Sequence, residues 1–302
     1  MTVSSMTFYS QMPDASHSAL EHRQATGSRG RLELEFLRDA RGITRLGRQY
    51  SSYPFHICRP FHLDDGPSEG LATVYTQSCS GGLYGLDRLF TNASVRERAQ
   101  VHLTTQASTV VHRATDGVTE QSSGIIAGEE ALVELFPDTT ILFPGANLKS
   151  SVRLSLADTA NAIIFDSFLA HDYNGEDRVF DLYENTITLS RLDGEPIAID
   201  RFRVTGNEFK SGGVGVAGGY VCHGSVLAAT SGVDVESLVG RLRSSVNATG
   251  QCTIGFSRLP RRSGFTARVL ASDAVPMRAA LLAIWRQFRL AVVGREPRPR
   301  RK

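Results

Sequence analysis

The feature that most constrains the fold of this chain is a series of short segments in which apolar and polar residues alternate. In the first, Leu32, Leu34 and Phe36 are apolar and the residues between them are charged. Similar segments recur as far as residue 204, separated by glycine and proline turn signals. Period-two alternation is typical of half-buried β-strands. Many short strands with turns about every 8–12 residues predict an all-β sandwich, a barrel or a helix-like stack. No strict sequence repeat is visible, so periodicity alone does not select the stack.

The remaining elements follow from the same patterns. The continuous apolar run Ala162–Phe168 predicts a strand buried on both faces, and Asp193-Gly194 predicts a hairpin turn. Other strands are expected at residues 43–50, 71–77, 118–126, 132–136, 152–156, 179–183, 187–192 and 197–204. The predicted fold class is mainly β, a helix-like stack or two-layer arrangement of many short strands, with two late α-helices.

The two helices are predicted from apolar residues at helical spacing. The first begins near Val235, with Asp234 as its N-cap, and the second runs from about Pro276 to Val293. An apolar stripe on the second helix predicts core packing or a groove for a partner, and Arg278, Arg286 and Arg289 are expected to lie off this stripe.

Three regions follow from these patterns. Residues 1–28 have little periodicity and predict a disordered leader. Residues 29–293 predict a single large β-rich domain. Residues 294–302 predict a basic, mobile tail.

The segment from Cys79 to Arg113 stands out within this pattern. It opens with Gly81 and Gly82, and paired glycines are used where the backbone needs a positive φ or a close approach. Alternation from Val95 then leads into Thr104-Thr105-Gln106, interrupted only at Glu97. The segment is therefore predicted to form a loop, a strand, a kink and a second strand.

The overall composition excludes several classes of protein. A net charge of +2 does not by itself indicate nucleic-acid binding. The four cysteines, Cys58, Cys79, Cys222 and Cys252, form no CxxC pair, so neither a zinc ribbon nor a disulfide framework is expected. No signal peptide and no apolar run of about 18 residues is present. We therefore expect a cytoplasmic protein with reduced thiols and no membrane or nucleic-acid partner.

A hydrolase would need a nucleophile with a base within hydrogen-bond reach. Ser80 precedes two glycines, and His56 and Asp64 lie upstream in a suitable order. However, Cys79 stands where such enzymes carry an aspartate, and the surroundings of His56 do not match. A hydrolase is therefore the weakest of the alternative interpretations.

Two further segments carry metal-binding or phosphate-binding residue types. His56, Cys58, His62, Asp64 and Asp65 offer imidazole, thiolate and carboxylate groups suited to a borderline metal such as nickel, but at spacings that match no closed zinc site. A transient metal contact and a core role for Cys58 both remain open. Cys222-His223 follows a glycine-rich run that lacks a phosphate-binding signature, so it predicts a flexible hinge or a tight strand turn.

Six short motifs resemble one known family. They occur in family order over about residues 30–293 as RPF at Arg59–Phe61, GGLYGLDRL from Gly81, TTQAST at Thr104–Thr109 with Arg113 after it, ILFPGA at Ile141–Ala146, RVL at Arg268–Leu270, and Trp285 followed by Arg289. Together they resemble the urease accessory protein UreD family, called UreH in some organisms. The chain departs from the family pattern at Leu86, Val110 and His112. It therefore resembles a divergent member.

The resemblance implies a non-enzymatic chaperone for urease maturation. Such a protein binds the urease apoprotein and a complex of UreF and the GTPase UreG, and helps nickel reach the urease active site. The family fold is mostly β, a helix-like stack of strands with two helices. The implied partners are thus UreF-like and UreG-like proteins and apo-urease, with dimerisation through the partner complex. No tightly bound cofactor is expected, only Ni²⁺ in transit. A β-rich adaptor unrelated to urease and a hydrolase using Ser80 remain alternatives.

Nickel transit predicts carboxylates along a water-lined path through the β body. The candidates are Asp64, Asp87 and Glu176, with His56 and His62 as possible additional ligands. For Asp87 a turn-capping role is the open alternative. The remaining motif residues are expected to be structural, namely Arg59, Phe61, Gly81, Gly82, Thr104, Thr105, Gln106, Arg113, Pro144, Gly145 and Trp285.

Overall fold

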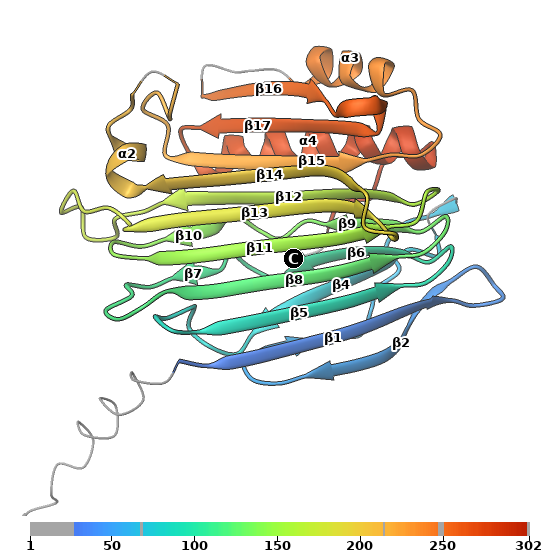
Figure 1. The fold of residues 1–302 in the computed structure, drawn as a ribbon, viewed down its shortest axis with the longest axis horizontal. Helices are drawn as coiled ribbons and strands as arrows, with labels where there is room; N and C mark the ends of the chain where they lie inside the picture. The colour runs from blue at the N-terminus through green and yellow to red at the C-terminus, as the bar shows by residue number, and fades with distance from the viewer. Residues whose placement is uncertain (1–26, 67–68, 214, 247–250, 301–302) are drawn as a thin grey trace, which may run out of the picture.

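The structure is a computed structural model that describes residues 27–66, 69–213, 215–246 and 251–300. The predicted leader therefore lies outside the described residues except for Gly27 and Ser28. Figure 1 labels the elements, which are β1 (Arg29–Arg38), β2 (Thr44–Ser51), β3 (Phe55–Ile57), β4 (Ala72–Ser78), β5 (Arg88–Val95), β6 (Gln100–Thr105), β7 (Val110–Val111), β8 (Thr119–Ala127), β9 (Leu132–Leu135), β10 (Thr140–Leu142), β11 (Asn147–Leu156), β12 (Asn161–Ala170), β13 (Leu182–Arg191), β14 (Pro196–Thr205), α2 (Gly206–Lys210), β15 (Cys222–Ala229), α3 (Val235–Ser245), β16 (Cys252–Arg258), β17 (Gly264–Ala271) and α4 (Ala274–Val293).

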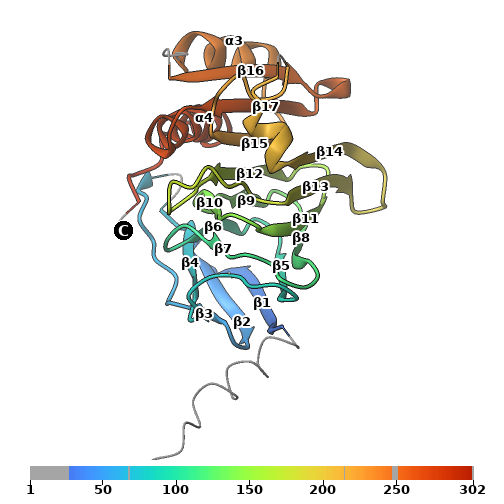
Figure 2. The same cartoon turned by 90° about the vertical axis from the view of Figure 1, so that its left-hand side faces the viewer.

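The strands form two sheets that face each other (Figure 2). The seven-stranded sheet has the order β14-β13-β11-β8-β5-β1-β2. The ten-stranded sheet follows the path β16-β17-β15-β12-β9-β6-β4-β3, and β7 and β10 pair beside it. From β4 to β13 the chain passes back and forth between the sheets, and neighbouring strands in this part of each sheet are parallel. This is a helix-like stack, and it confirms the predicted fold class.

The alternating residues point into the space between the sheets. In β1 the buried positions alternate with more exposed ones, and Leu32 and Phe36 have no exposed surface. Burying a side chain of this size contributes about 1.5–3 kcal/mol. The inward faces of β5, β6, β8 and β11 join the same core. The pattern that predicted the strands therefore also forms the main core.

The two late helices cover the outer face of the ten-stranded sheet at one end of the stack (Figure 2). Asp234 caps α3, as predicted, by accepting hydrogen bonds from the backbone of Glu236 and Ser237. The cap of α4 is Asp273, so this helix begins two residues before Pro276. This cover explains why β12 is buried on both faces.

Three local predictions were wrong. The predicted kink near Glu97 is a change of sheet, since β5 pairs with β1 and β8 and β6 pairs with β4 and β9. Cys222-His223 is not a hinge, because it begins β15, in which every residue is buried. The strands predicted at residues 179–183 and 187–192 are not separate, because β13 spans Leu182–Arg191 as one strand. The short helix α2 carries a Thr205–Glu208 capping box and was not predicted.

Candidate functional site

A cavity with both polar and apolar walls lies between the two sheets. Its volume is about 100 Å³, enough for roughly three water molecules at about 30 Å³ each. Its walls include Thr104 and Thr105 of β6, Ser150 of β11, Asp166 of β12 and Tyr183 of β13. Large apolar side chains, among them Leu34, Leu103 and Phe165, form the rest of the wall.

The cavity adjoins a second pocket of about 270 Å³ beside the glycine loop. Ser80, Gly81 and Gly82 line this pocket. The two spaces share five of their lining residues, Phe55, Thr76, Thr105, Thr109 and Gln121. The pocket beside the glycine loop therefore adjoins the space between the sheets.

The glycine loop is shaped by close backbone packing. Gly82 has a φ of 140°, and a Cβ there would lie 2.6 Å from the carbonyl oxygen of Val110. His112 stacks on Tyr84 with ring centroids 4.5 Å apart, and its Nε2 lies 3.1 Å from the Gly81 carbonyl oxygen. The residue that departs from the family pattern at position 112 thus packs against the loop.

Asp87 at the end of this loop holds backbone in place. Its carboxylate is 6% exposed and accepts hydrogen bonds from the backbone N–H of Ser28 at 2.6 Å and of Tyr84 at 2.8 Å. Its contacts are those of the turn-capping role. Arg113 has a similar structural position, because its side chain fills the space above Gly145, whose φ is 74°. Leu86 takes a positive φ of 69°.

The Thr-Thr-Gln motif joins the cavity to the neighbouring strands. The Thr105 hydroxyl accepts a hydrogen bond from the Asp138 N–H at 2.8 Å. Gln106 receives one from the amide of Gln77, and its own N–H donates to the Thr76 carbonyl at 3.0 Å. The motif therefore fixes the cavity wall.

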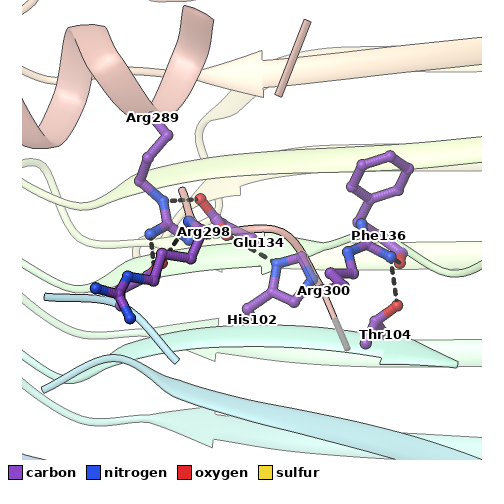
Figure 3. Close-up of polar contacts among 8 residues, drawn as sticks. His102, Thr104, Glu134, Phe136, Arg289, Arg298 and Arg300 are labelled. Carbon is purple, nitrogen blue, oxygen red and sulfur yellow. Dashed lines mark hydrogen bonds and ion pairs between the residues drawn. The ribbon is translucent and has the colours of Figure 1, made fainter. Parts of the chain in front are cut away.

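A buried charge network lies on the outer face of the ten-stranded sheet, beneath α4 (Figure 3). Glu134 has no exposed surface and accepts hydrogen bonds from Arg289 Nε at 2.6 Å and from His102 Nδ1 at 2.8 Å. Arg289 Nη1 binds Asp64 at 2.5 Å. Arg289 is 1% exposed, so the prediction that it lies off the helix stripe was wrong.

The protonation states of this network follow from burial and charge. Burial lowers the pKa of His102 to about 4, so this histidine is neutral at pH 7 and donates through Nδ1. Burial alone would raise the pKa of Glu134, but the charge and hydrogen bonds of Arg289 outweigh burial and lower it. Glu134 is thus a carboxylate bound to a guanidinium.

The basic C-terminal segment contacts this network. The backbone N–H of Arg298 donates to Asp64 at 2.8 Å. Arg300 donates to the Thr104 hydroxyl at 2.7 Å, and its guanidinium carbon lies 4.0 Å from the Phe136 ring centre and 5.1 Å from that of Trp285. Sequence analysis predicts a mobile tail, and in the structure its residues up to Arg300 lie against the domain.

The predicted metal ligands are distributed over separate elements. His56 is exposed and hydrogen-bonded to Gln77, and His62 contacts the Thr44 carbonyl oxygen at 2.9 Å. Glu176 is exposed and pairs with Arg178 at 2.9 Å. Over the described ranges, no group of three or more His, Cys, Asp or Glu side chains is arranged to hold a metal ion.

The hydrolase residues have other partners. The Ser80 hydroxyl donates to the Gly82 carbonyl at 2.7 Å, and Asp64 binds Arg289. Neither contact forms the serine–histidine pair that the mechanism needs. The geometry therefore does not favour this alternative.

Comparison with known proteins places the chain in a family. The family model described as UreD urease accessory protein matches residues 28–302. The chain belongs to the urease accessory protein UreD family. It is 37% identical to Urease accessory protein UreD 1 of Methylorubrum populi, over 91% of this chain and 92% of that protein. It is 33% identical to Urease accessory protein UreD 1 of Pseudomonas syringae pv. syringae, over 89% and 94%. A UreD of Cenarchaeum symbiosum is 30% identical over 82% and 86%.

UreD membership supports a role in urease maturation for this chain. Among the residues described, no helix is long and apolar enough to cross a membrane. The buried charges were not predicted from the sequence, although a signal for them is present. Glu134 and Asp166 are single acidic residues within apolar runs. Arg289 lies four residues after the buried Trp285 in the sequence.

Proposed function

We propose that this protein is a non-enzymatic scaffold for urease maturation that links apo-urease to UreF-like and UreG-like partners and assists nickel delivery. Family membership over residues 28–302 supports the urease role over that of an unrelated adaptor. The proposed setting is the cytoplasm. UreD-type relatives share the name accessory protein, which fits a role without catalysis.

The observation that carries the nickel part of this proposal is the set of polar groups in the cavity between the sheets. Hydroxyl, amide and carboxyl groups line it, and these groups hydrogen-bond to the water shell of a cation. Ni²⁺ binds oxygen and nitrogen ligands and is released readily where no closed site forms. A Ni²⁺ ion in transit that keeps part of its water shell is therefore cargo that suits the polar part of this lining.

The cavity changes which residues we assign to the path. Asp166 and Tyr183 line it, whereas Asp64 is bound by Arg289 and Asp87 holds a turn. We therefore propose that the interior residues of β6, β8, β11, β12 and β13 contact the cargo. The predicted histidines would act, if at all, at the surface.

Co-expression tests the function directly. The tagged chain is produced with apo-urease subunits and UreF-like and UreG-like partners, and the purified complex is tested for each component. The proposal predicts that all components co-purify and that omitting this chain leaves urease with little nickel. Fully loaded urease in its absence, or failure of every partner to co-purify, would refute the scaffold.

A further inference from the structure

Residues 295–300 follow α4 and lie against the body of the protein through contacts that involve side chains. Gly294 ends the helix with a φ of 78°, in the left-handed region that favours glycine. Pro297 and Pro299 have no backbone N–H to donate. Within the described ranges, no backbone-to-backbone hydrogen bond joins residues 295–300 to the rest of the chain. This segment can therefore leave the body without breaking a strand or a helix.

Two arginines of the segment enter a slot whose walls offer hydrogen-bond acceptors and aromatic rings (Figure 3). We call it the arginine slot and define it by Asp64, Asp65, Thr104, Phe136 and Trp285. The backbone N–H of Arg298 donates to Asp64 at 2.8 Å, and its guanidinium pairs with Asp65. Arg300 donates to the Thr104 hydroxyl at 2.7 Å. The segment thus reaches the slot through both a carboxylate pair and a hydroxyl.

The slot presents groups that suit a guanidinium. Carboxylate, hydroxyl and carbonyl oxygens accept N–H donors, and aromatic ring faces attract a cation. Nη1 of Arg300 also donates to the Phe136 carbonyl oxygen at 3.3 Å. The guanidinium carbon lies 4.0 Å from the ring centre of Phe136 and 5.1 Å from that of Trp285. A planar guanidinium stacks on such rings, whereas the ammonium group of lysine does not. The slot therefore selects arginine.

The arginine that occupies the slot is incompletely satisfied. Nε and Nη2 of Arg300 are buried and have no hydrogen-bond partner within the described part of the chain. Burial lowers the pKa of Arg300 to about 10, because the guanidinium loses its hydration. The pair between Arg298 and Asp65 is more than half exposed, and exposed pairs contribute little. The segment is therefore held weakly enough to exchange.

The segment also leaves space beside it. A pocket of about 380 Å³ lies where the segment meets the loop that carries Asp65. Its lining residues are His62, Leu63, Asp65, Arg298, Pro299 and Arg300. Residues 298–300 thus do not fill the groove in which they lie, and an extended segment of another shape can enter there.

We propose that the arginine slot is a docking site for an extended, arginine-bearing segment of a partner protein, and that residues 295–300 occupy it as a competitor in the free chain. Charge complementarity argues for this occupant, because the slot offers two carboxylates and two rings and already holds arginine. Docking of the partner segment displaces the chain's own residues. The proposal rests on the proposed function only in that a scaffold has protein partners, and it does not involve nickel.

The test uses the fluorescence of Trp285, which is the single tryptophan of the chain. A guanidinium lies over its ring, so its emission reports whether the slot is occupied. The probe is a synthetic peptide with the sequence of residues 295–302, and the control peptide carries Arg298→Lys and Arg300→Lys, which keep the net charge. In the full chain, Arg298→Ser with Arg300→Ser empties the slot. Arg295→Ser is the matched control, because Arg295 is an exposed arginine of the same segment.

We expect the arginine peptide to change Trp285 emission saturably in the doubly substituted chain. It should bind the wild-type chain and Arg295→Ser about tenfold more weakly, because their own segment competes. A segment on a short linker has an effective concentration of about 1 mM, which weakens a peptide with a Kd of about 0.1 mM by roughly this factor. The lysine peptide should bind at least severalfold more weakly than the arginine peptide in the doubly substituted chain.

No saturable change in the folded double variant, or equal binding of the two peptides, would overturn the docking site. Equal affinity in the wild-type chain and the double variant would overturn the competition. If the double variant does not fold, Arg300→Lys keeps the charge and loses the stacking, and severalfold tighter peptide binding than in the wild-type chain is then expected. Unchanged affinity in that variant also contradicts the proposal. Because the titration uses the isolated chain, failure of the urease partners to co-purify would instead concern the proposed function.

Discussion

Replacing Arg289 by methionine removes the cation that holds Glu134 and Asp64 together beneath α4. Methionine keeps much of the arginine stem, so most packing survives. The guanidinium donates to both carboxylates, at 2.6 Å to Glu134 and 2.5 Å to Asp64, and is 1% exposed. Removing one partner of a buried ion pair costs about 3–5 kcal/mol. With two carboxylates left behind, we expect at least the upper end of this range.

That loss is large relative to the roughly 5–15 kcal/mol that stabilises a folded domain. Urea unfolding followed by circular dichroism measures it, with Arg178→Met as control, because the Arg178–Glu176 pair is exposed and such pairs contribute about 0–1 kcal/mol. Adding Glu134→Gln to Arg289→Met should recover part of the stability by removing one orphaned charge. A loss below about 1 kcal/mol, or no recovery in the double variant, would refute the reasoning.

Three further predictions concern stability. The folded state keeps His102 and His223 neutral, so the unfolded state binds more protons between pH 6.5 and about 4. The free energy of unfolding should therefore fall by about 1.4 kcal/mol for each histidine and each unit by which the pH is lowered through this range. Urea unfolding at pH 7 and 5.5 checks this, and equal stability at the two pH values would contradict it. Gly82→Ala should destabilise the folded protein by about 1–3 kcal/mol, because Gly82 has a positive φ and an added Cβ would meet the Val110 carbonyl oxygen. Gly255→Ala should be nearly neutral, because an added Cβ there meets no atom. Similar melting temperatures for the two variants would be inconsistent with this prediction. Asp87→Asn should lower stability by about 1–3 kcal/mol without lowering urease nickel content per folded chain, and the opposite pattern would restore a nickel role.

Local alternation was sufficient to predict many of the strands before residue 205, whereas β15, β16 and β17 were not predicted. Leu32, Leu34 and Phe36 reveal the inner face of β1 without knowledge of its partners. The change of sheet at Glu97 could not be read in this way, since alternation continues on both sides of the turn. Which strands pair is decided by contacts between distant parts of the chain.

The buried polar groups were hidden for the same reason. Glu134 and Arg289 are 155 residues apart in sequence, and Asp64 and Arg289 are 225 apart. An isolated acid in an apolar run signals that a partner exists, but the partner is identified only by the fold. For this reason Asp64 and Asp87 were predicted as nickel ligands from the sequence, whereas Asp166, which lines the cavity, was not.

The most direct test of the central claim is the nickel content of urease matured with a filled cavity. Ser150 of β11 lines the cavity, while the adjacent Ser151 is not among the lining residues, so Ser150→Phe and Ser151→Phe are a matched pair. Each is co-expressed with urease and the partner proteins, and co-purification and thermal unfolding confirm an intact complex. The account predicts a severalfold loss of nickel per urease active site with Ser150→Phe and wild-type loading with Ser151→Phe. Wild-type loading with a folded, complex-forming Ser150→Phe would contradict it.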